Sequence, residues 1–78
     1  MSLYSHRYTL LRKELVRLRI EAGFTQRDLS AKLKKAQPHI SKVETGERFL
    51  DVIDFVTWTE AVKGDPVALI KRIASVKT

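Results

Sequence analysis

The sequence predicts an all-α protein of five helices with no sheet. Apolar residues recur at steps of three and four along most of the chain, and no segment alternates in the manner of a strand. All three glycines and both prolines stand where a helix would begin or end. With 44% hydrophobic residues in a chain of 78, there is material for one domain, residues 1–78, with a modest core.

The first helix is expected to run from Ser5 or Arg7 to Ala22. Its apolar residues at helical spacing are Tyr8, Leu11, Leu15, Leu18 and Ala22. Gly23 follows, where a left-handed C-terminal cap favours glycine. The opposite face is charged, and exposure to solvent is the simplest explanation for its members, which are Arg12, Lys13, Arg17, Arg19 and Glu21.

Two short helices joined by a tight turn are expected over residues 25–45. Thr25 and Asp28 match a capping box, so the second helix should begin near Gln26 and end at Leu33. The apolar stripes of the pair are expected to be Phe24, Leu29, Ala31 and Leu33, then Ile40 and Val43. The polar residues between them should face outward, and they are Gln26, Arg27, Lys32, Lys35, Gln37, His39, Ser41 and Lys42. Such a surface suits a polyanion.

The turn and the third helix carry signals of their own. Lys34 stands where glycine would adopt a left-handed conformation easily, at a cost of about 1 kcal/mol relative to glycine. Pro38 places the start of the third helix near Gln37, because a first-turn position has no intrahelical N–H bond to lose. Gly46 should end the third helix just after Thr45.

The last two helices are strongly apolar. Asp51 and Asp54 predict a fourth helix that ends at Val62 or Lys63, and Asp65–Pro66 should begin a fifth that reaches about Ser75. The fourth helix is apolar around more of its circumference than one stripe requires. It is therefore either central in the core or partly in an interface. The candidates for a dimer surface are Phe49, Trp58, Val67, Ile70 and Ile73, although core packing is the simpler explanation for any one of them.

Positive charge is concentrated in the first part of the chain. The net charge is +6, and residues 1–48 hold eleven Lys/Arg against five Asp/Glu, whereas residues 49–78 hold four of each. This asymmetry favours a phosphate-bearing partner, although charge alone also fits a solvated face. The chain has no cysteine, and no apolar run approaches the about 18 residues of a membrane span, so a cytoplasmic protein is expected.

A polar helix that follows a tight helix–turn pair is the usual device for entering the major groove. The pattern Thr25-Gln26, Leu29-Ser30, Leu33, Gln37 and the run of residues 40–48, ISKVETGER, resembles the Cro/C1-type, or XRE, helix-turn-helix family. The resemblance covers about residues 8–70, with the helix-turn-helix proper at 25–45. It implies a five-helix, lambda-repressor-like fold and a bacterial or phage transcriptional regulator associated with the nucleoid.

The resemblance also implies site residues. Gln37, Pro38, Lys42 and His39 match exposed positions of the recognition helix, where an amide can pair with adenine and a lysine can address guanine or a phosphate. Phosphate contacts are expected from Gln26, Arg27, Lys35, Ser41, Thr45 and Arg48, with Gly46 in the same loop. Glu44 resembles a structural family residue that closes onto backbone or a basic side chain. Lys34 and Pro38 depart from the family pattern, so DNA shape is expected to supply part of the specificity.

Two functions therefore follow as hypotheses. The first is a repressor that binds an inverted repeat of double-stranded DNA as a homodimer, with half-sites about 34 Å apart. The second is an antitoxin or protein-interaction module that binds a small protein partner, with DNA binding secondary. An enzyme, a cofactor and a metal site are not expected, because the sequence has no thiol, no paired histidines and no glycine-rich phosphate loop.

Overall fold

The computed structural model describes residues 5–77 and confirms the five predicted helices. They are α1 (His6–Glu21), α2 (Gln26–Leu33), α3 (Gln37–Thr45), α4 (Val52–Ala61) and α5 (Pro66–Ala74). Residues 5–77 contain no strand, and the observed boundaries agree with the predicted ones to within two residues. No helix in this part of the chain is long and apolar enough to cross a membrane.

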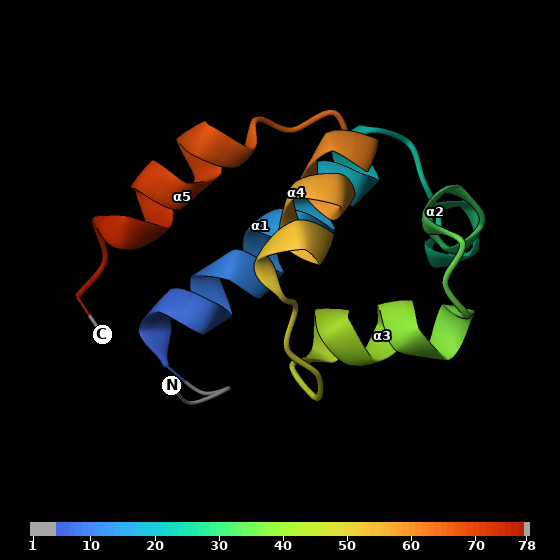
Figure 1. Cartoon of the computed structure of the whole chain (residues 1–78), viewed down its shortest axis with the longest axis horizontal. Helices are drawn as coiled ribbons and strands as arrows, with labels where there is room; N and C mark the ends of the chain where they lie inside the picture. The colour runs from blue at the N-terminus through green and yellow to red at the C-terminus, as the bar shows by residue number, and fades with distance from the viewer. Residues whose placement is uncertain (1–4, 78) are drawn as a thin grey trace.

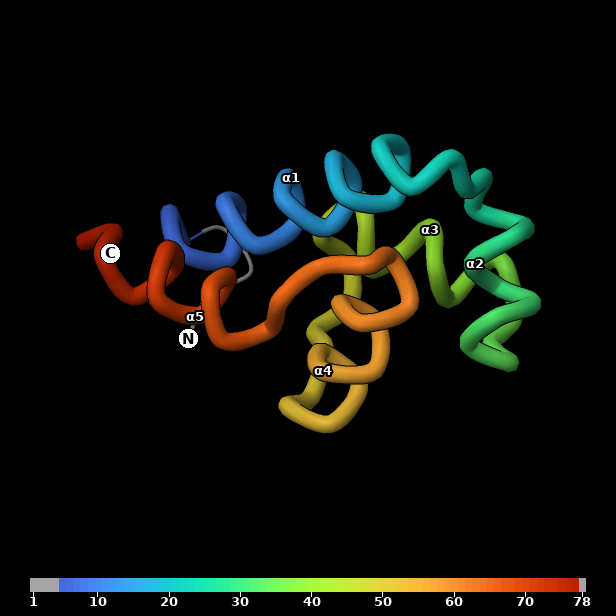
Figure 2. Tube along the Cα trace, turned by 90° about the horizontal axis from the view of Figure 1, so that it is seen from above, coloured from blue at the N-terminus to red at the C-terminus, as the bar shows by residue number. Residues whose placement is uncertain are grey.

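The helices are arranged around α1 and α4. Figure 1 shows α2 and α3 together at one end of the molecule and α5 at the other, and the view from above in Figure 2 agrees. Helix α5 packs along α1 and α4, while α2 and α3 pack on each other and reach α4 and α1 respectively. The predicted helix pair, α2 and α3, therefore lies at one end of the molecule and is not covered by α5.

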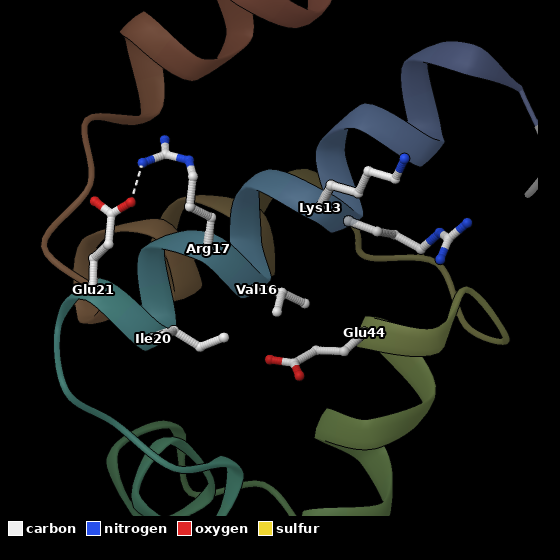
Figure 3. A pocket seen from close by; sticks show the side chains of 7 residues that line it. Lys13, Val16, Arg17, Ile20, Glu21 and Glu44 are labelled. Atoms are coloured by element: carbon white, nitrogen blue, oxygen red, sulfur yellow. Dashed lines mark hydrogen bonds and ion pairs between the residues drawn. The ribbon is translucent and has the colours of Figure 1, made fainter.

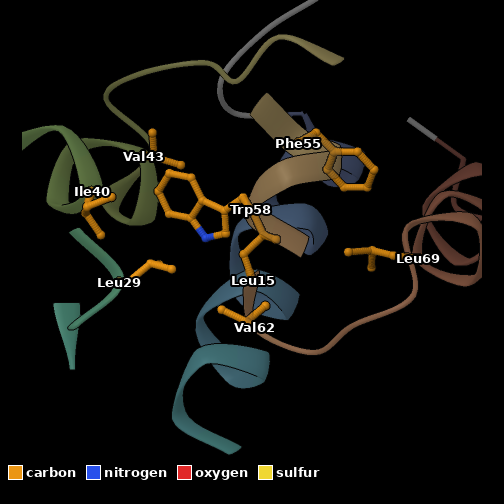
Figure 4. Close-up of a cluster of buried hydrophobic side chains, with 8 residues drawn as sticks. All are labelled: Leu15, Leu29, Ile40, Val43, Phe55, Trp58, Val62 and Leu69. Carbon is orange, nitrogen blue, oxygen red and sulfur yellow. The ribbon is translucent and has the colours of Figure 1, made fainter. Parts of the chain in front are cut away.

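All five helices contribute to one hydrophobic core, which is drawn in Figure 4. Its members are Leu15 of α1, Leu29 of α2, Ile40 and Val43 of α3, Phe55 and Trp58 of α4, Val62 and Leu69. Trp58 extends from α4 toward α3 and is only 1% exposed. The prediction that Trp58 contributes to a dimer surface is therefore wrong, because its indole fills the space between α3 and α4.

Polar side chains cap α2, α4 and α5 as their sequences predict. Thr25 Oγ1 accepts the N–H of Asp28 at 3.0 Å, and Asp28 accepts the N–H of Thr25 at 2.9 Å, which completes the capping box of α2. Asp51 Oδ1 accepts the N–H of Asp54 at 2.8 Å, and Asp65 caps α5 in the same manner. Each cap satisfies a backbone donor that has no acceptor within its own helix.

The turn between α2 and α3 accommodates a lysine in place of glycine. Lys34 adopts the left-handed conformation, with φ of 55° and ψ of 41°. Ser30 secures the turn from both sides, because its carbonyl accepts the N–H of Lys35 at 3.1 Å while its hydroxyl donates to the carbonyl of Lys35. The turn thus keeps the left-handed geometry expected of glycine, at the conformational cost predicted for Lys34.

Two expectations about packing need correction. Ala31 was expected in the buried stripe of α2 but is exposed, because α2 covers the core with Leu29 and Leu33 alone. Arg19 was expected on the solvated face of α1 but is mostly buried against α3, in an ion pair described below. At the end of α4, the left-handed residue is Lys63, with φ of 63°, and not Gly64. Gly64 is needed for space, because a Cβ there would lie 2.9 Å from Leu18 Cδ1.

Candidate nucleic-acid interface

Helix α3 presents a polar arc to solvent at the open end of the molecule. At about 100° per residue, Gln37, Ser41, Thr45, Pro38 and Lys42 follow one another around about 140° of the helix. Gln37, Pro38, Lys42 and Thr45 are exposed and Ser41 is half-buried, whereas Ile40 and Val43 on the opposite side are buried. The structure therefore brings three of the four predicted base-reading residues onto one accessible surface.

One edge of this arc is fixed by Glu44, which forms an ion pair with α1 and accepts a hydrogen bond from α2. Arg19 Nε and Nη2 of α1 donate to the two carboxylate oxygens of Glu44 at 2.7 and 3.1 Å, and Gln26 Nε2 of α2 donates to Glu44 Oε1 at 2.9 Å. The side chain of Glu44 is 5% exposed and that of Arg19 is 12% exposed. The structural role predicted for Glu44 is confirmed, and the carboxylate sets the position of α3 relative to α1 and α2.

The other edge of the arc is held by His39. Its ring is half-buried beside Leu33, Lys35 and three residues of α4, which are Asp54, Thr57 and Trp58, around a hollow of about 50 Å³. His39 Nε2 is enclosed and has no hydrogen-bond partner among the described residues. Burial lowers the pKa of His39, the nearby charges of Arg48 and Lys35 lower it further, and Asp54 opposes them. The ring thus faces α4, unlike Gln37, Pro38 and Lys42.

The N-terminus of α2 offers backbone donors beside the same end of the molecule. Thr25 satisfies the N–H of Asp28, whereas the first-turn N–H groups of Gln26 and Arg27 receive no acceptor from within the helix. The hydrogen bonds with Thr25 lower the pKa of the Asp28 carboxyl, so its carboxylate form is favoured within the capping box. Arg27 is exposed, and Gln26 is half-buried with its amide fixed by Glu44. A helix terminus of this kind favours an anion.

The loop after α3 has less free backbone than the sequence suggests. Gly46 adopts φ of 86°, and the N–H groups of Gly46 and Glu47 donate to Val43 and Lys42 carbonyls at 3.2 and 2.8 Å. The hydroxyl of Thr45 donates to Glu47 Oε2 at 2.7 Å. Arg48 and Lys35 are exposed and form no ion pair among residues 5–77. The available donors are therefore the side chains of Arg48 in this loop and Lys35 in the turn before α3, and not these two amides.

The partners of two buried polar side chains are not evident from the sequence. Glu14 is buried, and its carboxylate pairs with Arg17 of α1 at 2.6 Å and with Arg72 of α5 at 2.8 Å. Tyr8 is buried as well, and its hydroxyl accepts the N–H of Leu50 at 2.8 Å. Helical spacing predicts where a residue points, but it does not predict which distant partner meets it. No three His, Cys, Asp or Glu side chains of the described residues lie together as metal ligands do.

A short helix pair with an exposed polar second helix, supported by three further helices, defines the class of helix-turn-helix DNA-binding domains. The helix-turn-helix family matches residues 15–52 of the chain. No curated protein sequence matches the chain significantly.

The solved structures identify the family. An XRE-family like protein from Pseudomonas syringae pv. tomato shares 38% identity with a TM-score of 0.84, covering 92% of this chain and 88% of the other. The chain therefore belongs to the XRE family, and it is a DNA-binding transcription regulator of the helix-turn-helix type.

Two further structures support the fold alone. A point mutant of the restriction-modification controller protein C.Esp1396I has a TM-score of 0.78 at 22% identity, covering 95% of this chain and 91% of that one. The wild-type controller protein has a TM-score of 0.77 at 21% identity, covering 90% and 92%.

Proposed function

We propose that this chain is a sequence-specific repressor that acts as a single domain and inserts α3 into the major groove of an inverted repeat. The exposed arc of α3 supports the proposal, because Glu44 holds one edge of the arc and His39 holds the other. In a recognition helix, the side chains that contact bases must be free, while the helix itself must be held in place. No catalytic role, cofactor or metal is part of this proposal.

Base reading falls to the free side chains of the arc. Gln37 can pair with adenine N6 and N7, Lys42 can address guanine O6 or N7, and Pro38 can contact a thymine methyl. His39 was predicted beside them, but its ring faces α4, so we assign it to holding α3 in place. With few readers, the shape of the DNA is expected to supply the remaining specificity.

Phosphate contacts frame the arc on both sides. On the α2 side, Gln26 and Arg27 carry the free N–H groups of the helix N-terminus. The remaining contacts come from the turn, from α3 and from the loop after it, through Lys35, Ser41, Thr45 and Arg48. These contacts position the domain on the duplex and do not depend on base sequence.

A substitution at Gln37 tests the reading role. Gln37→Ala should lose about 1–3 kcal/mol of discrimination against the wrong base pair, measured as the ratio of affinities for a selected site and for random DNA. Arg27→Ala serves as the matched control, because it should weaken binding to both DNAs alike. An unchanged affinity ratio in Gln37→Ala would overturn the assignment of Gln37 as a reader.

The homodimer is proposed from an apolar surface formed by α4, α5 and the loop before α4. Its large exposed residues are Phe49 (45% exposed), Val52 (69%), Ile53 (71%), Val67 (64%) and Ile70 (49%). Ile73 is half-buried in the adjoining hollow of about 410 Å³ between α1, α4 and α5. Because one small domain makes few base contacts, pairing two copies on half-sites about 34 Å apart would raise both affinity and specificity.

Sedimentation velocity tests the dimer. Val67→Glu should shift the wild-type dimer to monomer, because a second copy would bury this side chain. Ile20→Glu is the matched control, since Ile20 is 62% exposed on α1 and lies outside this surface. A wild-type protein that stays monomeric alone and on DNA would contradict the homodimer. It would leave the apolar surface to a small protein partner, as in an antitoxin, which is the second candidate function.

A further inference from the structure

The side chain of Arg12 lies across the end of the recognition helix. A Cβ placed on Gly46 would lie 2.7 Å from Arg12 Nε and 2.8 Å from Cζ, so the guanidinium group is packed against the backbone that follows α3. Gly46 is buried, although it lies in a loop. Arg12 belongs to α1 and is far from Gly46 in sequence, and helical spacing predicts only that it lies off the apolar stripe.

Among the arginines of α1, Arg12 is the one that forms no ion pair or hydrogen bond with the described residues. Arg7 donates to the carbonyls of Val76 and Ala74, Arg17 pairs with Glu14 and Glu21, and Arg19 pairs with Glu44. Arg12 forms no ion pair among residues 5–77, and its Nε is enclosed without a partner. The enclosed Nε cannot reach a ligand, whereas the terminal Nη groups of Arg12 form no hydrogen bond with the described residues and can donate to one.

The surroundings of Arg12 favour a phosphate. The loop beside it cannot offer the N–H groups of Gly46 and Glu47, because both complete the cap of α3. Arg12 packs on Gly46, which opens the loop that leads to Leu50. The exposed Arg48 lies in that loop. Arg12 and Arg48 thus bring positive charge from two separate segments to the same end of α3.

We propose that Arg12 is a further phosphate contact, which reaches from α1 past Gly46 to the DNA backbone beside the end of the recognition helix. This inference rests on the proposed DNA-binding function. The competing explanation is structural, in which Arg12 only covers Gly46 and offsets the partial negative charge at the C-terminus of α3.

The salt dependence of DNA binding separates the two explanations. A phosphate contact contributes about −0.9 to the slope of log K against log salt concentration, whereas a purely structural arginine contributes nothing. Arg12→Met should therefore make the slope less negative by about 0.9 and weaken binding to specific and random DNA alike, by about tenfold. Arg12→Lys keeps the charge and should keep the slope.

Arg17→Met is the matched control, because it removes the same charge from the same helix. Figure 3 shows Arg17 turned toward Glu21 and away from Glu44 across a surface hollow of about 470 Å³ that Arg12 also lines. Since Glu14 and Glu21 already pair with Arg17, its loss should leave the slope unchanged. Thermal unfolding of each variant, followed by circular dichroism, shows which of them are folded at the temperature of the binding assay.

The possible outcomes separate this inference from the proposed function. A folded Arg12→Met protein with the wild-type slope would overturn the phosphate contact, and so would an equal change of slope in Arg12→Met and Arg17→Met. An Arg12→Met protein that unfolds is replaced by Arg12→Gln, to which the same criteria apply. Wild-type protein that does not bind DNA would overturn the proposed function itself.

Discussion

Glu44 accepts hydrogen bonds from side chains of two other helices, so replacing it by leucine tests how this interface is held together. Glu44→Leu removes the acceptor of three hydrogen bonds and leaves the guanidinium group of Arg19 without its carboxylate. The side chain of Arg19 is only 12% exposed, so water does not readily replace the lost partner. One hydrogen bond remains to Arg19, to the carbonyl of Phe24 at 2.8 Å.

The expected cost is large for a domain of this size. Breaking a buried ion pair from one side costs about 3–5 kcal/mol, and the remaining bond to Phe24 favours the lower end of this range. A loss of about 3 kcal/mol is a substantial part of the about 5–15 kcal/mol that stabilises a small domain. It should lower Tm by about 12–24 °C.

Urea unfolding of a double-mutant cycle measures the effect. Arg19→Met with Glu44→Leu removes both charges, so it should recover most of the stability lost by Glu44→Leu alone, with a coupling energy of at least about 2 kcal/mol. Glu21→Gln is the control, because the exposed Arg17–Glu21 pair should contribute less than about 1 kcal/mol. A coupling energy near zero would refute the role of Glu44 in joining α1 to α3.

Three further predictions concern the turn, the cap and the edge of α3. Lys34→Gly should raise the free energy of unfolding by about 0.5–1 kcal/mol in urea, because φ of 55° favours glycine; a loss of stability would contradict this. Gly46→Ala should lower Tm, because φ is 86° and the new Cβ would overlap Arg12, and a second substitution, Arg12→Ala, should recover part of the loss. For His39, the folded state lowers the pKa from 6.5, so its contribution to stability should be complete above pH 6.5 and decrease as the pH falls below it. His39→Gln should remove that part of the pH dependence of urea unfolding, and an unchanged pH profile would contradict the burial of the ring.

Helix boundaries were predictable because each depends on residues close together in sequence. Thr25, Asp51 and Asp65 each cap a helix within three residues, and Gly23 and Gly46 adopt the left-handed conformation expected of them. The left-handed Lys34 was also predictable, because the length of the turn requires such a residue whatever the side chain.

The partners of charged residues were not predictable from one sequence. Helical spacing places Arg12, Arg17 and Arg19 alike off the apolar stripe of α1, yet one packs on Gly46, one pairs within its own helix and one is mostly buried against Glu44. What separates them is the crossing of α1 over α3, which depends on tertiary packing.

The apolar residues of the fourth helix divide between the core and the surface. Phe55 and Trp58 are buried in the core, whereas Val52 and Ile53 at the start of the same helix are exposed. A helix that is apolar around most of its circumference does not indicate which side meets the core. The side is decided by tertiary packing, since α4 packs on α2 and α5, and Trp58 lies beside Ile40 and Val43 in the core.

The central claim is that α3 reads DNA sequence as one half of a symmetric pair. Selection of bound duplexes from a random pool, at a fixed salt concentration near 0.15 M, tests it most directly. The predicted result is an inverted repeat whose half-sites are about 10 base pairs apart, centre to centre, or a multiple of this. Binding that is uniform across sequences, with no enriched motif after repeated rounds, would contradict the claim.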